Sequence, residues 1–212
     1  MGYTHYYHVT SYYKQEEWDA LLKDVKKLLE LPIPLMANGR VSIGTVGSNS
    51  HSKDDLLLAK NLGDLINQTK SELDSVPYYN IDEKEISFNG IGELSHEQFH
   101  IYRQMPPEVF ERHEEFAKTY RVPSGINDKG GAVMLHPYFE CTKTARKPYD
   151  IVVQCCLILA KKHLDKGIAV SSDGGEDEWT DAIRIIEKNF GYKVKTRWSR
   201  FFDGGEIFSK VN

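Results

Sequence analysis

Residues 149–163 read Tyr-Asp-Ile-Val-Val-Gln-Cys-Cys-Leu-Ile-Leu-Ala-Lys-Lys-His, and this stretch decides the fold. Apolar residues occupy nearly every position from 151 to 160, so a helix formed here is apolar almost all round. Such a helix is stable only when other elements cover it on every side. The sequence therefore predicts a buried central helix over 149–163, around which the rest of the chain packs.

Lys143, Arg146 and Lys147 lie immediately before this helix, in the stretch Thr-Lys-Thr-Ala-Arg-Lys-Pro-Tyr-Asp of residues 142–150. Proline is favoured at a first helical position, and a helix start carries unpaired N–H groups and the positive end of the helix dipole. Added cations make such a start suitable for phosphate or carboxylate. The pattern predicts an anion site, with Asp150 either capping the helix or pairing with Arg146. The alternative is that the cations are solvated surface charges.

Outward from the central helix, strand-like and helical patterns alternate without an internal repeat. Alternation and β-branched or aromatic content predict strands over 3–13, 41–46, 84–89, 98–103, 168–171 and 192–202. Helical spacing of apolar residues predicts helices over 15–31, 53–73, 108–120 and 178–190, with a connection over 77–83 and a loop over 122–136. This irregular alternation favours a single α/β or α+β domain over 1–212, with a mixed β-sheet flanked by helices.

The composition is that of a soluble globular protein, since 40% of the 212 residues are hydrophobic and 27% are charged. A formal net charge of −4 argues against bulk binding of nucleic acid. No apolar run is long enough to span a bilayer, and the first residues lack the features of a signal peptide. Three cysteines, two of them adjacent at 155 and 156, favour free thiols in a reducing compartment. We therefore expect a cytoplasmic protein with no membrane partner.

Four segments carry a resemblance: Met-Gly-Tyr-Thr-His-Tyr-Tyr at 1–7, Ile-Ser-Phe-Asn-Gly at 86–90, the stretch 142–150, and Val-Ser-Ser-Asp-Gly at 170–174. Together they resemble a family of uncharacterised small proteins that occur in bacteriophages and bacteria, often as mobile-element cargo. Residues 32–80 and 104–136 lie outside these motifs, which implies family-variable insertions, and Tyr7 stands where the family usually has Trp. The resemblance implies no reaction. It implies that the segments share a site, and an accessory phage role such as counter-defence in the host cytoplasm.

Further candidate ligand-binding residues lie on the first strand and after the strand at 168–171. Tyr3, His5 and Tyr7 share one face of a strand and offer stacking and polar contacts. Asp173 follows a strand and precedes a helix, where ligands bind in open sheets, and it suits ribose hydroxyls or general-base work. The structural alternatives are aromatic packing within the strand and an acidic helix start near Asp173.

Histidines supply two weaker patterns. His96 and His100 lie four residues apart, but no third ligand follows at metal-binding spacing, so neither a metal nor a cofactor is predicted. The stretch from His8 to Thr10 matches half of a two-histidine phosphoesterase signature, and no second half is present.

The favoured function is binding, and sequestration, of a small anionic ligand, foremost a nucleotide or nucleotide signal. Lys143, Arg146 and Lys147 would hold phosphate, with Tyr3, His5, Tyr7 and Asp173 as the other ligand contacts. One alternative is a hydrolase or transferase acting on a nucleotide or phosphate ester, with His5 or His8 as acid or base, Asp173 as orienting carboxylate and Arg146 as clamp. Another is a protein-binding inhibitor of a host factor. Whether the chain is an enzyme, and whether it forms a homo-oligomer, stays open.

Overall fold

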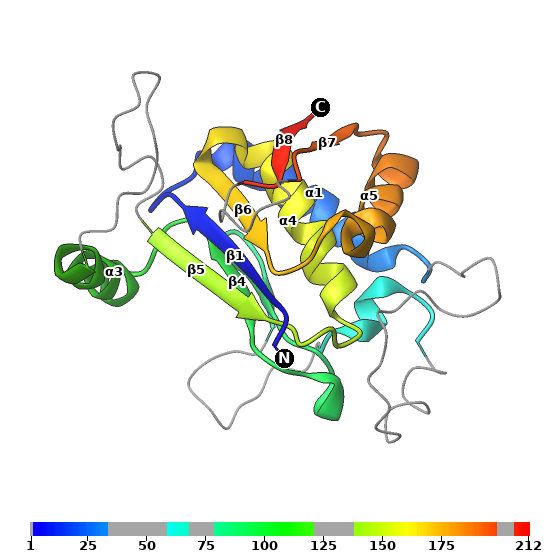
Figure 1. Ribbon diagram of the computed structural model, residues 1–212, viewed down its shortest axis with the longest axis horizontal. Helices are drawn as coiled ribbons and strands as arrows, with labels where there is room; N and C mark the ends of the chain where they lie inside the picture. The colour runs from blue at the N-terminus through cyan, green and yellow to red at the C-terminus, as the bar shows by residue number, and fades with distance from the viewer. Residues whose placement is uncertain (1, 34–58, 68–78, 121–137, 199–205) are drawn as a thin grey trace.

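The computed structural model describes residues 2–33, 59–67, 79–120, 138–198 and 206–212 (Figure 1). The strands are β1 (Thr4–Val9), β2 (Asn80–Ile81), β3 (Glu85–Phe88), β4 (Phe99–Tyr102), β5 (Tyr138–Lys143), β6 (Ile168–Ser172), β7 (Val194–Thr196) and β8 (Phe208–Val211). The helices are α1 (Gln15–Glu30), α3 (Pro107–Tyr120), α4 (Asp150–Leu164) and α5 (Glu176–Phe190), with short 3₁₀ turns η1 (Leu62–Leu65), η2 (Gly92–Leu94) and η3 (Asp165–Gly167). The expected α+β class is confirmed.

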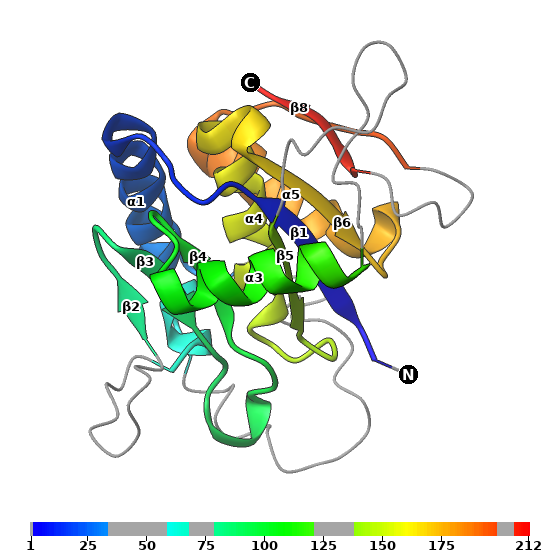
Figure 2. The same cartoon turned by 90° about the vertical axis from the view of Figure 1, so that its left-hand side faces the viewer.

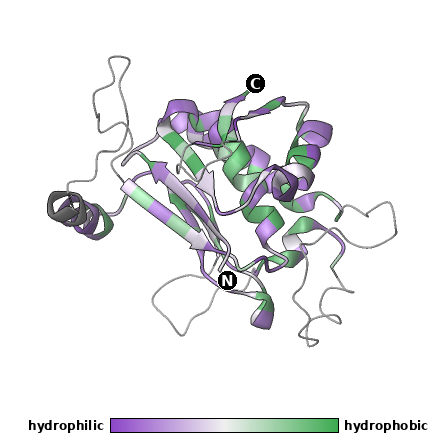
Figure 3. Cartoon of the chain, viewed as in Figure 1, coloured by the Kyte–Doolittle hydropathy of each residue, from purple (hydrophilic) through white to green (hydrophobic). Residues whose placement is uncertain are grey.

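Helix α4 occupies the centre of the fold, as its apolar sequence predicts. Every residue from Ile151 to Ala160 is buried. The helices α1 and α5 pack against it, as do β6 and β8. Figure 1 shows α4 between α5 and the sheet that contains β1, and Figure 3 shows hydrophobic residues along its length. Burial of one aliphatic side chain stabilises a fold by about 1.5–3 kcal/mol, so this helix supplies a large share of the core.

A three-stranded sheet in the order β5-β1-β6 covers one side of α4. Its central strand, β1, alternates between partly exposed and buried residues, with His5, Tyr7 and Val9 buried, and Tyr3 just before the strand is buried as well. This is the face that the alternation in the sequence predicts, and it points into the core. Both neighbours pair with β1 in antiparallel fashion.

A second sheet, in the order β2-β3-β4, contains the hairpin that the sequence predicts over 84–103. In the β3–β4 register, Ile86 lies opposite Ile101 and Phe88 opposite Phe99, and all four side chains are buried. The other face of these two strands is polar. A small third sheet pairs β7 with β8.

Several predicted elements differ from the structure. The ladders of the described residues are antiparallel, so three antiparallel sheets replace the single mixed sheet. Of the predicted helix 53–73, the described residues 59–67 contain only the short turn η1 (Leu62–Leu65), because the Asp64 carboxylate accepts the Lys60 and Asn61 N–H groups and Asn61 starts the turn in an extended conformation.

Strand boundaries also differ. The connection at 77–83 contains β2, and β7 ends at Thr196 within the predicted strand 192–202. The predicted strand 41–46 and loop 122–136 lie outside the described residues. Within the ranges that the structure describes, no helix has both the length and the apolar character needed to cross a bilayer.

Candidate functional site

Three segments that lie far apart in the sequence meet around the side chain of His5. In the sheet, β1 places His5 opposite Ser172 of β6 on one side and Thr142 of β5 on the other. Residues directly opposite on neighbouring strands direct their side chains to the same face. The turn after β5 then leads into α4, whose first residue is Asp150. Strand β1, the end of β6 and the start of α4 thus converge on one imidazole.

The His5 ring is completely buried and forms hydrogen bonds through both nitrogens. Its Nδ1 lies 2.9 Å from Ser172 Oγ, and its Nε2 lies 2.7 Å from Asp150 Oδ1. The same carboxylate accepts hydrogen bonds from Thr144 Oγ1 (2.5 Å) and Gln154 Nε2 (2.8 Å). Because Thr144 and Gln154 fix the Asp150 carboxylate in place, this carboxylate holds the His5 ring in one orientation. We call Ser172, His5 and Asp150 the buried relay.

Tyr3 and Arg146 cover the buried relay. The Tyr3 ring packs edge-on against His5 with 5.0 Å between ring centroids, and its hydroxyl, which accepts from Gln154 Nε2 (3.4 Å), lies near Ser172. Burial, and then the nearby negative charges of Asp150 and Glu178, raise the pKa of Tyr3, so its hydroxyl stays protonated. The Arg146 guanidinium lies 4.1 Å from the centre of the Tyr3 ring and pairs with Glu178 Oε1 of α5 (2.7 Å).

The turn that carries Arg146 has a strained backbone. Ala145 and Arg146 have φ angles of 51° and 56°, in the left-handed region that costs non-glycine residues about 1–3 kcal/mol each. The Tyr3 carbonyl accepts the N–H groups of both Thr144 and Ala145 (3.0 and 3.1 Å), which fixes the turn to β1. Because these φ angles are unfavourable, the hydrogen bonds to Tyr3 must stabilise the turn that places Arg146 over the Tyr3 ring.

The predicted cations do not act as one cluster. Only Arg146 lies beside the buried relay; Lys147 Nζ donates to the Glu93 carbonyl (3.0 Å), and the Lys143 side chain packs beside Gly2. All three precede α4, which begins at Asp150, and Lys143 is the last residue of β5. Neither expected role of Asp150 is seen, because its carboxylate bonds to His5, Thr144 and Gln154.

Of the other predicted ligand contacts, only Tyr3 and His5 lie at the relay, whereas Tyr7 and Asp173 lie elsewhere. Tyr7 is completely buried, and its hydroxyl donates to the His100 carbonyl (2.9 Å), so it has no surface to offer a ligand. Asp173 accepts from the Thr4 N–H (2.9 Å) and the Tyr6 hydroxyl (3.0 Å), both on the face opposite His5.

That placement corrects the predicted acid–base set. Asp150, rather than Asp173, is the carboxylate that orients His5. His8 lies on the same outer face as Tyr6, with its ring 5.3 Å from that of Phe139, and is separated from the relay by the sheet. The sequence patterns did not indicate Ser172, which belongs to the relay, or Thr144 and Gln154, which donate to Asp150. Ser172 and Thr144 lie within the motif segments quoted above, and this position was the one feature of the sequence that could have indicated them.

A second polar centre lies around Glu140 of β5. Its carboxylate accepts from His113 Nε2 (2.8 Å) and His100 Nε2 (3.1 Å). Burial alone would raise the pKa of Glu140, but hydrogen bonds from the two imidazoles and their charge lower it to about 2. Within the described ranges, no group of three or more His, Cys, Asp or Glu residues is arranged to hold a metal ion.

Comparison with protein-family models, with curated proteins and with solved structures found no match for this chain. Its function must therefore be inferred from its own geometry.

Proposed function

We propose that this protein is a hydrolase or transferase that uses Ser172 as a nucleophile against an ester of a small anionic compound. The proposal rests on one observation, the hydrogen bonds from Ser172 Oγ through His5 to Asp150 (2.9 and 2.7 Å). A serine hydroxyl is a weak nucleophile, and an adjacent imidazole oriented by a carboxylate activates it. His5 is buried whereas Ser172 is partly exposed, so Ser172 is the end of the relay that a substrate can reach.

The reaction follows from these hydrogen bonds. Ser172 Oγ attacks the acyl carbon or phosphorus of the ester while its proton passes to His5 Nδ1. The negative charge of Asp150 stabilises the imidazolium. The bond to the leaving alcohol then breaks, and His5 returns the proton to that oxygen. Water in a hydrolase, or a second alcohol in a transferase, attacks the Ser172 ester in the same way and frees the serine.

The ring is turned relative to that of serine proteases, in which Nε2 faces the serine. Here Nδ1 faces Ser172 and Nε2 faces Asp150. The chemistry requires one ring nitrogen on the nucleophile and the other on the carboxylate, and both orientations meet that requirement.

The Arg146 side chain is the feature near Ser172 that favours an anionic substrate, because the first turn of α5 carries three acidic residues, Glu176, Asp177 and Glu178, which oppose the positive end of its helix dipole. The Arg146 guanidinium lies on Tyr3, whose hydroxyl lies near Ser172. Its side chain is 40% exposed, and an anionic substrate group replaces the Glu178 carboxylate there. A phosphate-bearing compound, foremost a nucleotide, fits this charge.

Binding without turnover is the second candidate function. The observation in its favour is the exposed ion pair of Arg146 and Glu178, which a ligand anion can exchange without involving Ser172. Sequestration of a nucleotide signal in this way would suit the counter-defence role that the resemblance implies.

Labelling with a tagged fluorophosphonate tests the main proposal without knowledge of the substrate. An activated serine displaces fluoride from this reagent and becomes covalently phosphonylated. We expect the label on the peptide that contains Ser172, complete loss in Ser172→Ala, and a rate at least about 100-fold lower in Asp150→Asn. Ser171→Ala is the matched control, because Ser171 neighbours Ser172 in β6 but lies opposite Tyr6 on the other face. An unlabelled Ser172 in the folded wild-type protein would refute the proposal.

Chromatography of a nucleotide panel after incubation separates the two candidates. New products that form with wild type and not with Ser172→Ala indicate catalysis. Unchanged nucleotide, together with calorimetric binding that Arg146→Gln weakens, indicates sequestration. No heat and no product with any member would remove nucleotides as the ligand.

A further inference from the structure

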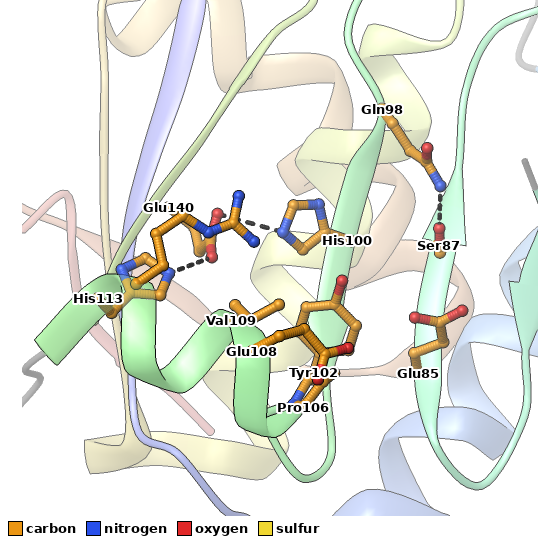
Figure 4. Close-up of a pocket in the computed structure, with 11 residues that line it drawn as sticks. Glu85, Ser87, Gln98, His100, Tyr102, Pro106, Glu108, Val109, His113 and Glu140 are labelled. Atoms are coloured by element: carbon orange, nitrogen blue, oxygen red, sulfur yellow. Dashed lines mark hydrogen bonds and ion pairs between the residues drawn. The ribbon is translucent and has the colours of Figure 1, made fainter. Parts of the chain in front are cut away.

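A cleft of about 580 Å³ lies on the polar face of the second sheet, away from the buried relay. Figure 2 shows α3 crossing in front of β4 and β5, and Figure 4 shows the side chains between them. Strands β3 and β4 supply one wall, α3 supplies the other, and Glu140 of β5 lies between them. The volume falls in the range of small-molecule sites, about 300–1,000 Å³.

Strand alternation explains why this cleft is polar. Ile86, Phe88, Phe99 and Ile101 fill the core, so the residues between them, Glu85, Ser87, His100 and Tyr102, face the cleft. In the register, Glu85 lies opposite Tyr102, and Ser87 lies opposite His100. The polar character of this wall therefore follows from the register of the hairpin.

The charges of the lining residues favour a cation. Three carboxylates, Glu85, Glu108 and Glu140, face one guanidinium, Arg112, so the cleft carries two excess negative charges when its histidines are neutral. Glu85 accepts a hydrogen bond from the neutral Asn80 amide (2.6 Å), which adds no positive charge beside it.

The histidines and Tyr102 add to this preference. Both His100 and His113 direct Nε2 to Glu140. A neutral imidazole that donates through Nε2 has Nδ1 as an acceptor. Tyr102 lies between Glu85, its cross-strand partner, and His100, whose ring centroid is 5.2 Å away. Its ring offers a negative face to a cation.

We infer that this cleft binds a small organic cation bearing amine or guanidinium groups, with Glu85 and Glu108 as its ion-pair partners and Tyr102 as its aromatic contact. The cation's N–H groups match the acceptors of the cleft: carboxylate oxygens and imidazole Nδ1 atoms. This binding needs neither Ser172 nor Arg146, so it stands apart from the proposed reaction.

Isothermal titration of the full chain with putrescine, agmatine and spermidine at low ionic strength tests the inference. We expect saturable binding of at least one of them and none of 1,4-butanediol, which has the length of putrescine without its charges. Glu85→Gln or Glu108→Gln should weaken binding about fivefold or more, as expected for loss of one ion pair. Tyr102→Leu should weaken it more than Tyr102→Phe, which keeps the ring.

Glu111→Gln provides the matched control. Glu111 and Glu108 are both exposed on α3, but only Glu108 lines the cleft. Equal weakening by the two changes would mean general surface attraction and would overturn the inference, as would the absence of binding by all three cations. The Ser172→Ala variant should bind the cation as wild type does, because Ser172 does not line the cleft. The cation inference is therefore tested independently of the proposed reaction at Ser172.

Discussion

At the residue scale, the carboxylates of Asp150, which is buried, and of Glu140, which is partly buried, share one design. Each accepts a hydrogen bond from a histidine Nε2, at 2.7 Å for Asp150 and at 2.8 and 3.1 Å for Glu140. Removing a carboxylate from water costs several kcal/mol unless fixed donors replace the lost hydration. These donors are fixed by strands and helices from different parts of the chain, so each carboxylate joins separate elements.

Glu140 should make stability depend on pH under acidic conditions. Its pKa falls from 4.5 to about 2 in the folded state, because hydrogen bonds from His100 and His113 outweigh the effect of burial. A lowered folded-state pKa contributes stability that is fully present above pH 4.5 and is lost as the pH falls toward 2. The contribution is on the order of 3 kcal/mol.

Urea unfolding of wild type and Glu140→Gln between pH 2 and pH 6 measures this effect. We expect the free energy of unfolding of wild type to fall more steeply below pH 4.5 than that of the variant, which cannot ionise at this position. Glu111→Gln, a change at an exposed site on α3, should keep the wild-type slope. Parallel curves for wild type and Glu140→Gln would contradict the assignment.

At the element scale, the turn from β6 to α5 determines how closely Tyr3 can cover the relay. A Cβ on Gly174 would lie 2.3 Å from the Tyr3 hydroxyl oxygen, whereas one on Gly175 would meet nothing within 4 Å. We expect Gly174→Ala to cost about 1–3 kcal/mol by overpacking and to slow phosphonylation of Ser172 by displacing Tyr3. Gly175→Ala, at the N-cap of α5, should cost less than about 1 kcal/mol and leave labelling unchanged. Thermal melts and labelling rates compare the two, and similar effects would exclude the Tyr3 contact as the cause.

Sequence periodicity predicted those elements whose burial is decided locally. The central helix, the inward face of β1 and the β3–β4 hairpin each follow from spacing within one segment. The turn η1 was missed because an Asn61–Asp64 capping box overrode an apolar stripe. At the site, the motifs contained the relay residues, but Ser172 lies 167 positions and Asp150 lies 145 positions from His5. No local pattern encodes such a pairing, which only the sheet register and the start of α4 create.

At the scale of the whole molecule, the fold encloses α4 so that each polar centre lies at its margin. The relay is at the first turn of α4, and the Glu140 cleft lies on the polar face of the second sheet, between that sheet and α3. Polar groups at these margins can then vary without entering the apolar centre. The stability of the centre is therefore measurable separately from either site.

The three cysteines provide that measurement. Cys141 is exposed on β5, whereas Cys155 and Cys156 are buried in α4, and burial raises the pKa of both helix thiols. At pH 8, a disulfide reagent such as DTNB should modify one thiol in the folded protein and three in concentrated guanidinium chloride. The two helix thiols can react only through opening of the core, which an ordinary domain stability of about 5–15 kcal/mol suppresses at least a thousandfold. Cys141→Ser should leave no fast-reacting thiol. Rapid modification of either remaining thiol in that variant would mean that α4 is uncovered on one side, because a thiol enclosed by α1, α5 and the sheet has no other route to the reagent.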